Sequence, residues 1–136
     1  MSDLYKSMQV SASGMKAQGT RLRIISENIA NADSVSQEPG GAPYRRKMVT
    51  FGNELNRELG VEKVVVKNII SDKSDFQREY LPGHPAADAD GYILRPNVNS
   101  LIEMNDMREA QRSYEANLQA IQASKSMLQR TLEILQ

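Results

Sequence analysis

The sequence contains no cysteine and no tryptophan, and it has one histidine among its 136 residues. Without cysteine the chain has no disulfide, no thiolate metal site and no cysteine nucleophile. Its 17 basic and 17 acidic residues cancel, so no strongly charged partner is indicated. Nucleic acid would require a basic face, and the only basic cluster, residues 45–47, is interpreted as the solvated start of a strand. With only two phenylalanines, the chain should be marginally stable alone.

Long apolar runs are also missing. The first ten residues lack the apolar core of a secretory signal, and no later stretch is long enough to span a bilayer. We therefore expect a protein that is not inserted in a membrane. A cytoplasmic location follows by the usual routes, although that inference fails for proteins exported without a cleaved signal.

Residues 98–136 contain neither glycine nor proline and are predicted to form one long amphipathic helix. Ser100 and Glu103 have the spacing of a capping box, which predicts that the helix begins near Ser100. Heptad spacing defines a largely apolar seam, made of Met104, Met107, Gln111, Tyr114, Leu118, Ile121, Lys125, Leu128, Leu132 and Leu135. Such a seam is typical of a helix that pairs.

A second stripe of mostly small residues runs beside this seam. Its members are Ala110, Ser113, Asn117, Ala120, Ser124, Met127, Thr131 and Ile134. Small side chains allow close backbone approach, which favours contact with several neighbours, but the stripe could equally be the solvated face of a monomeric bundle. Gln111 and Lys125 either select register and partner within the seam or lie exposed where the coil frays.

The amino-terminal segment repeats this design. Its own seam consists of Leu4, Met8, Ser11, Met15, Gln18, Leu22, Ile25, Ile29 and Ala32. Gly14 and Gly19 weaken the isolated helix and permit close packing, so we expect this segment to need a partner helix. The predicted fold is mainly α with a small β insertion: an axial helix in residues 1–32, a loop and β-rich insertion in 33–97, and an axial helix in 98–136.

The insertion begins with a loop rich in Ser, Gly and Pro at residues 33–43. Strands are predicted at 47–51, 61–70, 77–81 and 92–94, which together indicate a small antiparallel β unit. Residues 53–59 are compatible with a helical turn, and the pattern does not decide their structure.

The stretch around His84, Asp88 and Asp90 is where chemistry would be sought. An EF-hand loop is rejected, because its first and twelfth positions would be Ala86 and Asn97. A turn in which aspartates accept backbone N–H groups is favoured over a metal site. No nucleophile motif or phosphate-binding loop occurs, so we expect no enzyme activity, no metal and no cofactor.

Three motifs carry a family resemblance: residues 11–18 (SASGMKAQ), 26–34 (SENIANADS) and 114–117 (YEAN). They resemble the conserved ends of the bacterial flagellar axial proteins, the rod and hook family. The stretches at 43–47, 83–92, 96–99, 107–114 and 125–127 are similar to the proximal-rod members of that family. Motif residues carried over by the resemblance are Ser26, Asn28, Ile29, Ala30, Asn31, Tyr114, Glu115, Ala116 and Asn117.

The resemblance implies a structural subunit of the proximal rod of the flagellar basal body, which helps to carry motor torque to the hook. It implies export by the flagellar type III apparatus without a cleaved signal peptide, and assembly in the periplasmic space with itself, with proximal and distal rod subunits and with the basal-body junction protein. The expected assembly interface comprises Leu4, Met8, Met15, Leu22, Ile25, Ile29, Met104, Met107, Tyr114, Leu118, Ile121, Leu128, Leu132 and Leu135.

In this hypothesis the termini fold on incorporation, the two seams close on each other and the small stripe docks neighbouring subunits. Three alternatives stay open. They are a free-standing coiled-coil adaptor, a different rod or hook subunit, and a peptidoglycan hydrolase with Glu79, Asp88 or Asp90 as its acid.

Overall fold

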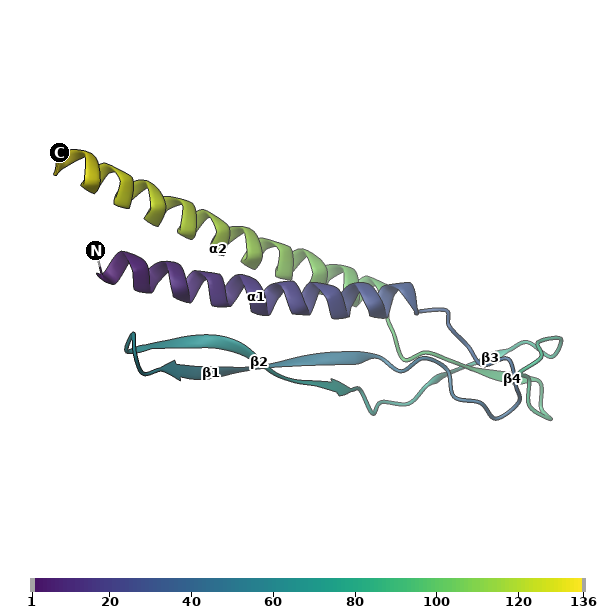
Figure 1. Cartoon of the computed structure of the whole chain (residues 1–136). Helices are drawn as coiled ribbons and strands as arrows, with labels where there is room; N and C mark the ends of the chain where they lie inside the picture. The colour runs from purple at the N-terminus through teal and green to yellow at the C-terminus, as the bar shows by residue number, and fades with distance from the viewer. Residues whose placement is uncertain (1, 136) are drawn as a thin grey trace. The chain divides into compact units, whose positions relative to one another are not determined.

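A computed structural model describes residues 2–135 and contains two long helices and four strands (Figure 1). Helix α1 covers Ser2–Ala30 and helix α2 covers Ser100–Ile134. About 48% of the chain is helical and 22% is strand, which confirms the predicted mainly α fold class. No helix among the described residues has a stretch long and apolar enough to cross a membrane.

The chain divides into two compact units, and each takes part of both helices. The first unit contains the residues up to Leu22, Val49–Asn68 and the residues from Arg108 onward. The second contains Arg23–Met48 and Ile69–Met107. The second unit therefore holds the end of α1 and the beginning of α2.

Helix α2 begins where the sequence predicted, but the capping box is wrong. The side-chain oxygen of Asn99 accepts the backbone N–H groups of Leu101 at 3.1 Å and Ile102 at 3.4 Å, so Asn99 is the N-cap. Glu103 instead directs its carboxylate to the Arg46 guanidinium, which is a stronger partner than a backbone amide.

The strands form two separate two-stranded antiparallel sheets. Strands β1 (Lys47–Asn56) and β2 (Val61–Ser71) form the longer one, and β3 (Gln77–Tyr80) pairs with β4 (Tyr92–Arg95). Residues 53–56, which the sequence left undecided, continue β1. The chain then turns at Asn56, whose side chain accepts two backbone N–H groups from the loop, and at Gly60, which has a φ of 64°.

In the first unit, the beginning of α1 and the end of α2 run antiparallel. A Cβ added at Gly14 would lie 2.9 Å from the side-chain nitrogen of Asn117, and Arg21 pairs with Glu109 at 3.7 Å. Ala110 and Ser124, each seven residues from Asn117, are 0% and 6% exposed. From Ala110 to Ser124 the small stripe therefore faces inward, because small residues let the two backbones approach closely, whereas Met127, Thr131 and Ile134 are exposed.

Only part of the large seam of α2 turns inward in this chain, because Met107, Tyr114, Ile121 and Leu128 are half-buried while other members are exposed. Leu118 is 38% exposed, Leu132 45% and Leu135 75%. Close approach along the small stripe turns the larger side chains of the neighbouring face outward. A large part of the apolar surface of α2 is consequently open to solvent.

Candidate functional site: a buried polar cluster

Asn28, in the last turn of α1, lies at the centre of the second unit and is 1% exposed. Its side-chain nitrogen donates to the carbonyl of Lys47 at 2.8 Å and to Glu103 Oε2 at 3.2 Å. Its side-chain oxygen accepts the backbone N–H of Lys47 at 2.9 Å and the Tyr44 hydroxyl at 2.7 Å. All four hydrogen bonds that an asparagine amide can make are used.

The two bonds to Lys47 are those that a neighbouring strand would make. Lys47 is the first residue of β1, and both its backbone N–H and its carbonyl are bound by one amide. Asn28 therefore joins the end of α1 to the beginning of β1. Through Glu103 it also reaches the first turn of α2.

Glu103 is itself 1% exposed, and a buried carboxylate is costly unless it is paired and hydrogen-bonded. One oxygen accepts from Asn28 and the other from the Arg46 side chain. Arg46 also pairs with Asp72 at 3.3 Å and Asp106 at 3.8 Å. A single guanidinium thus connects α2 with the end of β2.

The charged states of Arg46, Asp72, Glu27 and Lys47 are favoured at neutral pH. Burial alone would lower the pKa of Arg46, but hydrogen bonds to Glu103 and Asp72 and their negative charges raise it overall. The pKa of Asp72 is lowered by hydrogen bonds from Ser74 and then by Arg46. Lys47 Nζ lies 2.8 Å from Glu27 Oε1. The hydrogen bond between them lowers the pKa of the Glu27 carboxyl and raises the pKa of the Lys47 amine.

Asn97 completes the arrangement just before α2. Its side-chain oxygen accepts the backbone N–H of Arg46 at 2.8 Å, and its nitrogen donates to the carbonyl of Asp72 at 3.0 Å. We call this set the polar cluster; its members are Asn28, Tyr44, Arg46, Lys47, Asp72, Asn97 and Glu103.

The polar cluster is a structural connection between three elements. Its buried carboxylate is occupied by a guanidinium and an amide, and its asparagine has no hydrogen-bonding capacity left. Acid-base hydrolysis needs carboxylates in a cleft with separated pKa values, and this arrangement offers no such pair. What it does is fix the positions at which α1 ends, β1 begins and α2 begins.

The stretch around His84 is a turn, as the sequence predicted. Asp88 Oδ1 accepts the backbone N–H groups of Asp90 and Tyr92, each at 2.9 Å, and His84 Nδ1 accepts that of Ala86 at 3.0 Å. Glu79, considered above as an acid, is hydrogen-bonded to Arg95. From residue 2 to residue 135, no group of three His, Cys, Asp or Glu residues is placed to hold a metal ion.

Comparison with known proteins gives the family. Residues 8–36 match the family described as flagella basal body rod protein, and residues 89–134 match the C-terminal family of the flagellar basal body rod FlgEFG proteins. The flagellar basal-body rod protein FlgC of Agrobacterium fabrum is 53% identical over 99% of this chain and 97% of its own length. Those of Bacillus subtilis and Salmonella typhimurium are 41% and 38% identical, each over 96% of this chain and 97% of their own length.

The chain belongs to the FlgC family of flagellar basal-body rod proteins. It is accordingly a structural rod subunit of the flagellar basal body and not an enzyme. The resemblance to flagellar axial proteins is confirmed along nearly the full length of the chain.

In this FlgC-family chain the motif residues differ in burial and fall into three classes. Asn28 is buried, Ile29, Asn31, Tyr114 and Asn117 are half-buried, and Ser26, Ala30, Glu115 and Ala116 are exposed. Asn31, just after the end of α1, donates to the carbonyl of Glu27 in the last turn of that helix, and Asn117 contacts the Gly14 position. The motif therefore combines residues that hold the chain together with residues that face outward.

The residues predicted for the assembly interface also divide. Ile25 is buried, and the half-buried members are Leu4, Met8, Met15, Leu22, Ile29, Met107, Tyr114, Ile121 and Leu128. The exposed members are Met104, Leu118, Leu132 and Leu135. Gln111 and Lys125 are exposed in the chain. Their role in assembly remains a prediction.

Sequence reasoning missed most of the polar cluster. The basic cluster was predicted to be solvated, but Arg45 lies 4.1 Å from the centre of the Phe76 ring, and Arg46 and Lys47 are paired with carboxylates. A usable signal was present in the spacing, because Glu103 lies seven residues before Ala110 and thus continues the buried small stripe. A carboxylate at such a position requires a cationic partner.

Proposed function

We propose that this chain is a subunit of the proximal part of the rod, where it polymerises through its terminal helices and helps to pass motor torque to the hook. The observation that carries the proposal is the apolar surface left on α2. Leu118, Leu132 and Leu135 share the heptad spacing of a pairing helix, yet each is more than a third exposed. Exposed large apolar side chains that recur along one helix are typical of an interaction site.

The polar cluster supplies the other requirement of such a subunit. A torque-bearing polymer needs each subunit to hold its helices in a fixed direction, and a buried network with matched partners fixes direction better than apolar contact alone. Asn28 and Glu103 would then act on assembly indirectly, by orienting α1 and α2 before their outer faces meet neighbouring subunits.

Folding and export are part of the same proposal. The terminal helices would remain largely unfolded during passage through the type III export apparatus, without a cleaved signal peptide, and would fold when they join the growing rod in the periplasmic space. The proposed partners are further copies, other proximal and distal rod subunits and the basal-body junction protein. The small number of large buried side chains is consistent with a chain that gains much of its order from neighbours.

The test introduces a charge into the exposed seam. Leu118→Asp should abolish rod assembly and swimming, because a carboxylate would be desolvated against the neighbouring subunit. Gln119→Asp, which adds the same charge at the next exposed position, should leave swimming intact. Electron microscopy of isolated basal bodies and swimming in soft agar measure both; wild-type swimming of the Leu118→Asp strain would refute the proposed interface.

Hydrogen exchange on the purified chain tests the folding step. Residues of the second unit, which include the polar cluster, should be protected, whereas the outer ends of α1 and α2 should exchange nearly freely in a monomer. A discrete dimer or trimer with both helix ends protected would instead favour a free-standing adaptor.

A further inference from the structure

The side chain of Asn28 binds one edge of β1 at the beginning of the strand. The N–H of Asp72 donates to the carbonyl of Arg46 at 2.8 Å, so these two residues face each other where β1 and β2 meet. In an antiparallel pair, the backbone groups of successive residues point to opposite edges of a strand, so those of Lys47 point away from β2. Asn28 binds both the N–H and the carbonyl of Lys47 and thus occupies the position of a neighbouring strand.

Beyond Lys47 this edge of β1 has no partner among residues 2–135. The same alternation places on it the backbone groups of Val49, Phe51, Asn53 and Leu55. No backbone group outside the pair of β1 and β2 bonds to these residues. The side chains that form hydrogen bonds nearby, those of Thr50 and Asn53, reach β2 and leave the edge open.

The open edge of β1 also lacks the features that usually protect an edge strand. Residues 49–53 contain no charged residue and no proline, and Phe51 and Leu55 are 39% and 57% exposed. Proteins normally block such an edge with charge, proline, a bulge or a covering element, because its free N–H and carbonyl groups bind other strands. The chemistry of this edge therefore fits an extended backbone segment.

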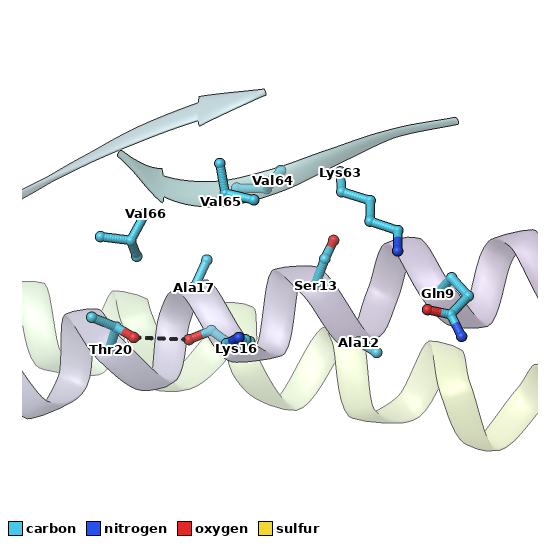
Figure 2. A pocket seen from close by; sticks show the side chains of 10 residues that line it. All are labelled: Gln9, Ala12, Ser13, Lys16, Ala17, Thr20, Lys63, Val64, Val65 and Val66. Carbon is cyan, nitrogen blue, oxygen red and sulfur yellow. Dashed lines mark hydrogen bonds between the residues drawn. The ribbon is translucent and has the colours of Figure 1, made fainter. Parts of the chain in front are cut away.

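Strand β2 contains a segment of this kind. Its residues 63–66 lie beside α1 in the first unit and line a groove there (Figure 2). Past this groove all five residues 67–71 are exposed, with Ile69 at 44% and Ile70 at 43%. The backbone groups of Lys67, Ile69 and Ser71 point away from β1, and within the described part of the chain no backbone group outside the strand pair bonds to them.

We propose that residues 49–55 of β1 pair with residues 67–71 of β2 from a second copy of this chain. The strands would run antiparallel with Phe51 opposite Ile69, since aromatic and β-branched side chains stabilise each other across strands. The two edges belong to different strands of one chain, so the contact is head-to-tail and can repeat from copy to copy. This inference rests on the proposed function, because it adds a strand contact to the helix contacts by which copies would join in the rod.

The charges favour this choice of partner strand. Residues 49–55 contain one charged residue, Glu54, and residues 67–71 contain one, Lys67. Pairing β1 with β2 therefore brings together opposite charges. Two β1 strands would offer two carboxylates and no cation, and two β2 segments would offer two amines and no carboxylate, so like-charge repulsion disfavours both of these pairings.

The absence of native cysteine makes cross-linking a direct test. Cells make two versions of the chain as their only copies, one with Val49→Cys and one with Ser71→Cys, so that a disulfide can form only between copies. These positions are opposite each other when Phe51 faces Ile69, and a disulfide needs Cα atoms within about 7 Å, so oxidised basal bodies should contain a dimer of the two versions. Val49→Cys with Ser126→Cys is the matched control, because Ser126 is an exposed serine of α2 and should give no dimer.

Proline substitution tests the backbone contact by itself. Asn53→Pro in the Val49→Cys version removes an outward N–H, which an edge strand tolerates where that N–H faces solvent, so the free chain should keep its fold and the dimer should be lost. Asn53→Ala is the matched control, because it removes the same side chain but keeps the N–H, and it should give the dimer. Amide exchange at Asp72, whose N–H bonds Arg46, should be the same in both purified variants.

The outcomes separate this contact from the proposed function. No dimer in basal bodies that contain both versions in normal amounts would overturn the strand contact and leave the proposed function standing. If the chain is missing from isolated basal bodies of swimming cells, the proposed function itself fails. A dimer of the Val49→Cys version with itself, a disulfide with a different basal-body protein, or equal product from the Ser126→Cys control would overturn the pairing of β1 with β2. Equal dimer formation by Asn53→Pro and Asn53→Ala would show that no backbone pairing occurs.

Discussion

We expect Asn28→Ala to destabilise the second unit more than the removal of any single side-chain amide at an exposed end of a helix. The substitution leaves the backbone N–H and carbonyl of Lys47 without their partners and removes one of the two groups bound to Glu103. A buried group left unpaired costs about 1–3 kcal/mol; Glu103 is fully buried, and Lys47 and Tyr44, which are half-buried, each add part of such a cost. We expect a loss of about 3–5 kcal/mol.

Amide hydrogen exchange at Lys47 measures this loss in the purified chain. Every 1.4 kcal/mol is tenfold, so protection at that amide should fall by more than about 100-fold. Asn31→Ala is the matched control, because Asn31 belongs to the same motif but its side-chain nitrogen donates only to the nearby carbonyl of Glu27 at the end of α1. Its effect should stay below about 1 kcal/mol.

Asn28→Asp separates hydrogen bonding from packing. The substitution keeps the shape but replaces the amide nitrogen by an oxygen that faces the carbonyl of Lys47 and the carboxylate of Glu103, so it should destabilise more than Asn28→Ala. Adding Glu103→Gln should recover part of the loss, because an amide can donate to the new carboxylate. The reasoning is refuted if Asn28→Ala costs no more than Asn31→Ala, or if Asn28→Asp is the milder of the two substitutions at position 28.

Three further predictions follow from other parts of the chain. Gly19→Ala should raise stability by about 1 kcal/mol in thermal melts. Gly14→Ala should give no such gain, because its Cβ would lie 2.9 Å from the Asn117 side chain of α2. Equal gains from the two substitutions would contradict the close packing at Gly14. Folding lowers the pKa values of Asp72 and Glu27, so these two groups should contribute constant stability near neutral pH, and that contribution should fall as acid below about pH 4.3 protonates them. Urea titrations at pH 7 and pH 3 measure this loss, and Asp72→Asn should reduce the difference between the two pH values. Asp88→Ala should cost about 1 kcal/mol and Asp88→Asn much less, since the amide oxygen can still accept the two backbone N–H groups; equal losses would argue against the turn.

The helices were predictable because their local signals agree. Residues 98–136 contain no glycine or proline, and Ser100–Ile134 is one helix. The start of α2 was placed correctly for a wrong reason, since Asn99 and not Ser100 is the cap. Both residues are common N-caps and adjacent in sequence, so composition alone could not choose between them.

The periodicity of the sequence did not show which face of α2 packs against α1. Counting large apolar residues favours the seam of Leu118 and Leu132 as the inner face, but two helices approach most closely along their smallest residues. Ala110 and Ser124 are buried for that reason, and Gly14 of α1 supplies the space opposite. Which of two neighbouring stripes is inside depends on the partner helix, and a single periodic segment does not contain that information.

Sequence reasoning identified one residue of the polar cluster as part of a conserved motif and missed the contacts that its other members make. Asn28 was carried over by family resemblance, whereas its partners come from segments 16 to 75 residues away in sequence. A hydrogen bond over such a separation leaves no local pattern. Only the spacing gave a hint, because Glu103 continues a stripe of small buried residues and a carboxylate there requires a cation.

The use of small residues inside the chain and large ones outside has an energetic consequence for assembly. Burying a large aliphatic side chain contributes about 1.5–3 kcal/mol, whereas alanine and serine contribute far less. A helix pair held along Ala110 and Ser124 is therefore weak by itself. Leu135 retains most of its burial energy until a neighbour covers it, and Leu118 and Leu132 retain more than a third of theirs. Ordering the helices then becomes favourable only when copies meet, so the same surface that makes the monomer marginal would make the polymer stable.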